Sequence, residues 1–111
     1  TEGVVEAYVH TGGRVGALVE LGCETDFVAR TAEFKDLAHN IAMQVAAMGP
    51  VYVSADDIED GDDRPPAQIA LLLQPFIKNS SSSVGDMVKE LAGKVGENIR
   101  VVRFSRLAVG E

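Results

Sequence analysis

Two segments rich in β-branched and apolar residues at the start of the chain, residues 4–10 and 15–21, predict a β-hairpin. The four residues between them include Gly12 and Gly13, which can take the positive φ angles of a tight turn. Alternate positions of the second segment are apolar and therefore share one face of a strand. These positions are Val15, Ala17, Val19 and Leu21. We expect that face to be buried.

Apolar residues recur every three or four positions between residues 31 and 48, which is the spacing of one buried helix face. They are Phe34, Leu37, Ala38, Ile41, Val45 and Met48. A long amphipathic helix is predicted here, and it should end at Gly49 and Pro50, because glycine favours helix ends and proline cannot continue a helix. Residues 51–54 are expected to be extended.

The second half of the chain predicts another helix preceded by a linker. Residues 67–73 predict a brief helix that closes before Pro75. The serine run 80–83 is expected to be a linker, and its last residue, Ser83, can cap a helix through the amide of Asp86. That helix has the apolar stripe Val84, Met87, Val88, Leu91 and Val95, and it should stop at Gly96.

A final β-rich segment, residues 99–109, predicts a strand with Val102 and Phe104 on one face and Val101 and Leu107 on the other. Two strands, a helical middle and one more strand predict an α+β fold, a three-stranded antiparallel sheet packed against helices. The chain has 111 residues, which suits one domain over residues 1–111. Six stripe residues should be buried, namely Leu37, Ile41, Val45, Met87, Leu91 and Val95.

The formal net charge of −7 argues against nucleic acid as a direct partner, because an acidic body repels phosphate. Much of this charge lies in residues 56–63, a cluster broken by Gly61 and followed by two prolines, which is typical of a solvated loop. A calcium site is the alternative, but the ligand spacing of an EF-hand is not there.

No apolar run is long enough to span a bilayer, and the start of the chain does not resemble a secretion signal. Cys23 is the only cysteine, so no internal disulfide can form. We therefore expect no membrane partner and a cytoplasmic location. Because the chain begins without Met, we expect a processed protein or an excised domain.

Candidates for catalysis are few, and we expect no enzyme, cofactor or metal site. Cys23 with His10 or His39 could form a thiolate pair, but a lone cysteine after an apolar strand is more typical of a buried small side chain. The two histidines lie on different elements, without the close spacing of metal ligands. Gly12 and Gly13 are not followed by the Lys and Ser/Thr of a phosphate loop.

The segment after the predicted hairpin is more informative. Thr25 can cap a helix start, which places Asp26 in the first turn, where a carboxylate meets free amides. Phe27 follows immediately. Its side chain either packs inward as core or projects as an anchor for another protein, and composition alone favours the core.

Residues 23–30, Cys-Glu-Thr-Asp-Phe-Val-Ala-Arg, resemble the signature of the elongation factor Ts family. Three further stretches resemble the family in the same order, namely residues 12–20, residues 74–78, and residues 96–99 leading to Arg103 and Phe104. Together they cover nearly the whole chain and imply the core, or dimerisation, domain of that family. Residues 41–44 are most similar to the cyanobacterial and plastid branch, which would add the plastid stroma as a location.

The resemblance implies a guanine nucleotide exchange factor that binds elongation factor Tu, GDP-bound or nucleotide-free, and promotes GDP release. It implies that Asp26 and Phe27, flanked by Thr25 and Val28, form the tip that enters the nucleotide-binding domain of that partner, with Phe27 as a wedge. It also implies that the family's N-terminal three-helix module is absent here. The alternative is a dimerisation or interaction module without exchange activity. A homodimer is also expected, because members of the family that this chain resembles often dimerise and because the last strand carries apolar residues on both faces.

Overall fold

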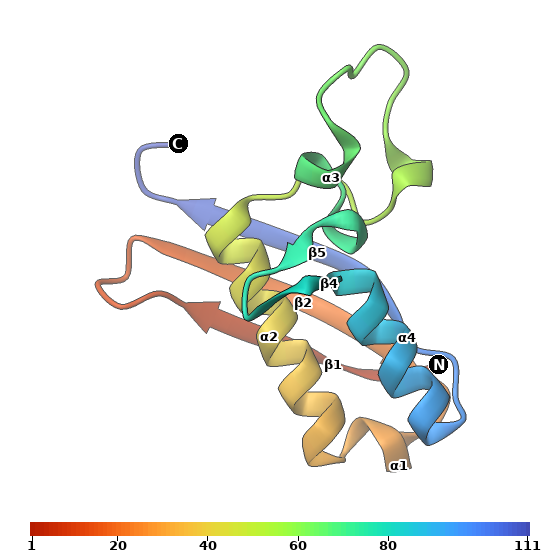
Figure 1. Ribbon diagram of the computed structural model, residues 1–111. Helices are drawn as coiled ribbons and strands as arrows, with labels where there is room; N and C mark the ends of the chain where they lie inside the picture. Colours follow the sequence, from red (N-terminus) through yellow and green to blue (C-terminus); the bar gives the residue numbers. More distant parts are fainter.

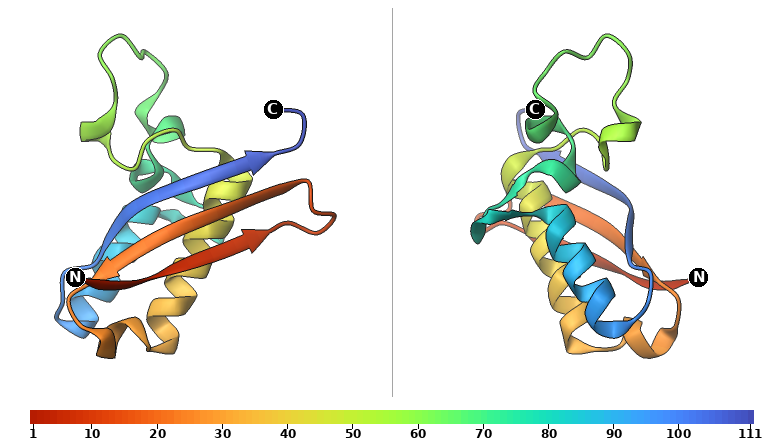
Figure 2. Two further views of the ribbon diagram at one scale, coloured as in Figure 1. Left: turned by 180° about the vertical axis from the view of Figure 1, so that it is seen from behind. Right: turned by 45° about the vertical axis from the view of Figure 1, so that its right-hand side comes forward.

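The computed structural model describes residues 1–111 and has a three-stranded antiparallel sheet in the order β1-β2-β5. The strands are β1 (Glu2–Val9), β2 (Val15–Cys23) and β5 (Arg100–Ala108). Helices α2 (Ala32–Met48) and α4 (Val84–Val95) cover one face of the sheet (Figure 1). Seen from behind, the three strands lie in front of both helices, and no helix covers this outer face (Figure 2). The predicted α+β class and its antiparallel sheet are confirmed.

The hairpin forms as its sequence predicts. β1 pairs with β2 from Glu2 opposite Cys23 to Val9 opposite Gly16, and Gly12 and Gly13 turn the chain with φ of 98° and 71°. The alternating apolar positions of β2 face the helices, and Val19 and Leu21 among them are completely buried. This central strand contributes four residues to the apolar core, and it ends at the segment that contains the candidate site.

The last strand contains a β-bulge that the sequence did not predict. Glu20 lies opposite Arg103, but Leu21 lies opposite Val101, so Val102 is an extra residue. The bulge moves Val101 to the core face and Val102 to the outer face, next to Gly22. The expected faces of β5 were therefore wrong at these two positions, because strict alternation fails at a bulge.

Both long helices begin and end at the expected residues. The hydroxyl of Thr31 accepts from the amide of Phe34 at the start of α2, and Ser83 and Asp86 form a reciprocal capping box on α4. Gly49 and Gly96 end the two helices in left-handed conformations. Four of the six stripe residues are buried, Leu37, Ile41, Val45 and Leu91, whereas Met87 and Val95 are half-buried.

The connection between these helices differs from the prediction. Residues 51–54 form no strand, although Tyr52 makes one parallel bridge to Ala70. The predicted helix 67–73 is divided at Ala70, whose backbone is extended, into α3 (Pro66–Ile69) and a 3-10 turn η2 (Leu71–Leu73). A further 3-10 turn, η1 (Ala55–Asp57), lies in the acidic loop.

The serine run is a strand and not a linker, which corrects the prediction. β4 (Asn79–Ser83) pairs with β3 (Pro75–Phe76). A buried pair of glutamines holds this small hairpin on α2. The Gln44 side chain donates to the Gln74 side chain at 3.2 Å and to the Pro75 carbonyl at 3.0 Å, and it accepts from the Ile77 amide at 2.9 Å. Gln44 thus holds β3 and the turn after it, and β4 is extended because it pairs with β3, a contact that the propensity of its serines does not specify.

Candidate functional site

A single helical turn, α1 (Asp26–Ala29), follows β2 at the end of the sheet opposite the hairpin turn (Figure 1). Four residues are too few for a helix to persist alone. Thr25 caps this one as predicted, since its hydroxyl accepts from the Val28 amide at 3.3 Å. The side chains of Val28 and Ala29 are buried in the core, which fixes the turn to the body of the protein.

Phe27 projects from this turn with 75% of its surface exposed. By contrast, Phe34 is completely buried and Phe76 is nearly so. The structure therefore excludes the first of the two options left open by the sequence, because Phe27 is not part of the core. A large aromatic side chain held out on an anchored turn is available to contact another molecule.

Asp26 is exposed beside Phe27. Its carboxylate accepts from Arg30 at 3.0 Å, and both side chains of this ion pair remain largely in solvent. Exposed pairs of this kind contribute little to stability. Asp26 can therefore exchange Arg30 for a partner's donor at small cost.

The turn before α1 is held by a residue far away in the sequence. One carboxylate oxygen of Glu97 accepts from the backbone amides of Glu24 and Thr25, each at 3.1 Å, and the other accepts from the Thr25 hydroxyl at 2.6 Å. The Glu24 carboxylate in turn accepts from the Asn98 amide at 2.6 Å. Sequence reasoning did not assign Glu97 to the site; its only signal was its place in the stretch 96–99 of the family resemblance.

The cysteine hypothesis finds no support in the geometry. Cys23 is buried and its thiol donates to the Thr25 carbonyl at 3.2 Å. Burial, and after it the charge of Glu97, raise the pKa of the Cys23 thiol, whereas a nucleophilic cysteine needs a lowered pKa. His39 bonds to Glu6 at 2.9 Å and His10 to the Tyr8 hydroxyl at 3.0 Å.

The acidic loop is organised by its own contacts. Asp62 accepts from two guanidinium nitrogens of Arg64 at 2.6 and 2.9 Å, from the Arg64 backbone amide at 3.3 Å, and from the Tyr52 hydroxyl at 2.9 Å. The Arg64 hydrogen bonds hold the pKa of the Asp62 carboxyl far below its usual range. No group of three or more His, Cys, Asp or Glu side chains is placed to hold a metal ion. No helix is long and apolar enough to cross a membrane.

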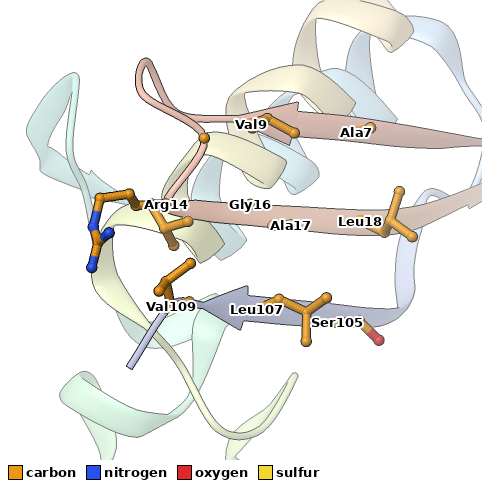
Figure 3. A pocket seen from close by; sticks show the side chains of 12 residues that line it. Ala7, Val9, Arg14, Gly16, Ala17, Leu18, Ser105, Leu107 and Val109 are labelled. Atoms are coloured by element: carbon orange, nitrogen blue, oxygen red, sulfur yellow. The ribbon is translucent and has the colours of Figure 1, made fainter. Parts of the chain in front are cut away.

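The outer face of the sheet is a second unusual surface. A shallow groove of about 480 Å³ lies on this face, and Figure 3 shows the side chains that line it, which come from all three strands and include Val9, Leu18 and Leu107. Leu107 is 81% exposed and Leu18 is 50% exposed. Arg14 lies at the hairpin end of the groove, and the Glu20–Arg103 ion pair lies toward the other end of β2.

Comparison with known proteins gives this geometry a context. The family profile described as "Elongation factor TS" matches residues 1–62, which include β1, β2, α1 and α2. The curated "Elongation factor Ts" of Synechococcus sp. strain RCC307 is 47% identical over 141 positions, covering 99% of this chain and 65% of the relative. The chain belongs to the elongation factor Ts family. The elongation factor Ts proteins of Carboxydothermus hydrogenoformans and Thermotoga neapolitana are 43% and 44% identical to this chain, and the alignments cover 65% and 70% of their lengths.

This chain thus spans about two thirds of the length of its elongation factor Ts relatives. The alignment with the Synechococcus protein runs over 141 positions, more than the 111 residues here, so that relative has residues within the aligned region that this chain lacks. The segment that resembles the elongation factor Ts signature, residues 23–30, occupies the end of β2 and the whole of α1.

Proposed function

We propose that this chain is a guanine nucleotide exchange factor that binds elongation factor Tu and promotes GDP release during translation elongation in the cytoplasm. Family membership supports the activity. The observation that carries it is Phe27, 75% exposed on a turn whose next two residues are buried. An aromatic side chain held in this way can enter a pocket of a partner without the entropy loss of ordering a flexible loop.

The proposed mechanism is a difference in affinity. Phe27 enters between helices of the nucleotide-binding domain of elongation factor Tu and disturbs the magnesium site that holds GDP. The factor therefore binds the nucleotide-free form more tightly than the GDP-bound form, and by linkage its binding weakens GDP. No covalent step is needed, and the exchange factor supplies no cofactor of its own.

The four residues expected at the site have different parts in this proposal. Asp26 and Phe27 are exposed and contact elongation factor Tu. Thr25 caps the turn, and the buried side chain of Val28 anchors it, so these two residues support the contact from below. We also propose that residues 1–111 act as one core domain, since one apolar cluster includes side chains of β2, α2, α4 and β5.

The test is the release of a fluorescent GDP analogue from elongation factor Tu after rapid mixing with this chain and excess unlabelled GDP. The release rate should rise with the concentration of the chain and then saturate. The spontaneous rate at every concentration, with a well-folded chain, would refute the proposal.

The outer face of the sheet supports a second function, self-association. Its exposed apolar side chains come from all three strands, and soluble monomers rarely leave such a continuous patch uncovered. We propose that a second copy packs on this face. Sedimentation at micromolar concentration should show a dimer, and Leu107→Glu should convert it to monomer. Monomer alone in the parent chain would remove this proposal.

Tight binding of elongation factor Tu without faster GDP release would favour the interaction module over the exchange factor.

A further inference from the structure

We infer that Glu97 is a positioning residue for Phe27, acting through Thr25 on the start of α1. This inference rests on the proposed exchange function. Glu97 lies outside residues 23–30, near the end of the chain, in the connection between α4 and β5. It has no contact with Phe27 among the hydrogen bonds of the site, so its effect must pass through the turn that carries Phe27.

The turn before α1 and the turn before β5 each provide a carboxylate that accepts hydrogen bonds from the other turn. Glu97 accepts three hydrogen bonds from Glu24 and Thr25, while Glu24 accepts one from the Asn98 amide. Four hydrogen bonds therefore join two turns separated by more than 70 residues, and we call them the Glu24–Glu97 clasp. The carboxylates of Glu24 and Glu97 have the same charge, and the hydrogen bonds that each accepts from backbone amides of the opposite turn offset their repulsion. The Thr25 hydroxyl and these amides also lower the pKa of Glu97, which keeps its carboxylate charged.

The Thr25 hydroxyl connects the clasp to α1. A hydroxyl has a single proton, so donation to Glu97 at 2.6 Å leaves its lone pairs free for the Val28 amide at 3.3 Å. Glu97 thereby orients the cap of α1. Without this acceptor, the hydroxyl can rotate and the first amides of a four-residue turn lose a fixed partner.

This role predicts a particular kinetic signature. If loosening the clasp leaves Phe27 correctly placed in only a fraction of molecules, the apparent affinity for elongation factor Tu is the intrinsic affinity multiplied by that fraction. At saturation the partner selects the competent molecules, so the maximal rate of GDP release is unchanged. Removing Phe27 itself should instead lower the maximal rate. A loss confined to the half-saturating concentration therefore separates positioning from direct contact.

The experiment compares Glu97→Gln with Glu90→Gln, which makes the same change of charge at an exposed position of α4. We expect Glu97→Gln to raise the half-saturating concentration about tenfold with the maximal rate unchanged, and Glu90→Gln to match the parent. Thr25→Ser keeps the hydroxyl and should therefore raise the half-saturating concentration less than Thr25→Val does. Thr25→Val removes the hydroxyl that connects Glu97 to the Val28 amide, so it should show the same kind of defect as Glu97→Gln. The defects of the double variant should be less than additive, because the two changes share the Thr25–Glu97 hydrogen bond.

A second measurement needs no elongation factor Tu. Amide hydrogen exchange of Val28 should be faster in Glu97→Gln than in Glu90→Gln and the parent. If the parent chain does not accelerate GDP release, the exchange function fails, and the Val28 amide alone decides whether the clasp holds α1. Equal protection in the two glutamine variants, additive defects in the double variant, or a lowered maximal rate in Glu97→Gln overturns the positioning role.

Discussion

Replacing Phe27 by Ala should remove exchange activity while leaving the fold almost unchanged. The matched comparison is Phe34→Ala, the same substitution at a completely buried position of α2, seven residues further along the chain. If Phe27 serves a partner and Phe34 serves the core, the two variants should fail in opposite ways.

The expected stability losses follow from burial. Phe27 is 75% exposed, so only a quarter of its surface is removed from water. At about 25 cal/mol per Å², that quarter of a side chain of about 200 Å² contributes about 1 kcal/mol at most. Alanine recovers about half of this through its higher helix propensity. At Phe34 the same change costs about 3 to 5 kcal/mol, because it also leaves a cavity.

These differences are large on a thermal scale. For a domain of this size each kcal/mol shifts the unfolding midpoint by about 4 °C, so Phe27→Ala should lower it by about 2 °C and Phe34→Ala by about 12 to 20 °C. In the GDP release assay Phe27→Ala should lose about 30-fold, since an aromatic anchor contributes about 2 kcal/mol or more. Two results would refute the reasoning: a Phe27→Ala chain as unstable as Phe34→Ala, or one that folds and still exchanges at the parent rate.

Three further changes probe other parts of the structure. Asp26→Ala should slow GDP release several-fold while shifting the unfolding free energy by less than about 0.5 kcal/mol, because its ion pair is exposed; a large loss in urea unfolding would contradict this. Gln44→Leu keeps the volume but leaves the Ile77 amide unpaired, and it should cost about 1 to 3 kcal/mol in urea unfolding, with no cost being the contrary result. The backbone amide and then the hydroxyl of Ser83 lower the pKa of Asp86, so this carboxylate stabilises the fold above its unfolded pKa and loses that effect as pH falls through its folded pKa. Asp86→Asn should therefore flatten the decline of the unfolding midpoint below about pH 4, and an unchanged pH profile would exclude this role.

Much of the fold could be predicted because local patterns and tertiary packing agree. The hairpin, both long helices, the Ser83 cap and the glycine ends of the helices were correct, since each depends on residues close together in the sequence. The stripes were correct in part, because Met87 and Val95 are half-buried and Met48 is exposed. The β-bulge at Val102 was missed, because nothing in residues 99–109 distinguishes an extra residue from regular alternation. The serine strand β4 was missed for a related reason: it is extended by pairing with β3, and Gln44, more than 30 residues earlier, holds β3 and the turn between the two strands.

The candidate site could be predicted only in part. The cap at Thr25 follows from residue types, but burial of Phe27 was the better expectation from composition, and only the family resemblance pointed outward. Glu97 could not be linked to Thr25 from the sequence, because the antiparallel pairing of β2 and β5 brings their connections together. Such contacts are a property of topology rather than of local pattern.

Site-specific crosslinking from position 27 asks most directly whether Phe27 enters elongation factor Tu. A photoreactive phenylalanine analogue at this position, mixed with nucleotide-free elongation factor Tu, should crosslink to the nucleotide-binding domain. Excess GDP should suppress that crosslink, because the two ligands weaken each other reciprocally. The same analogue in place of the exposed Val109 is the control and should give no such GDP-sensitive product. Crosslinks from position 27 that are insensitive to GDP, or that join only two copies of this chain, would contradict the wedge.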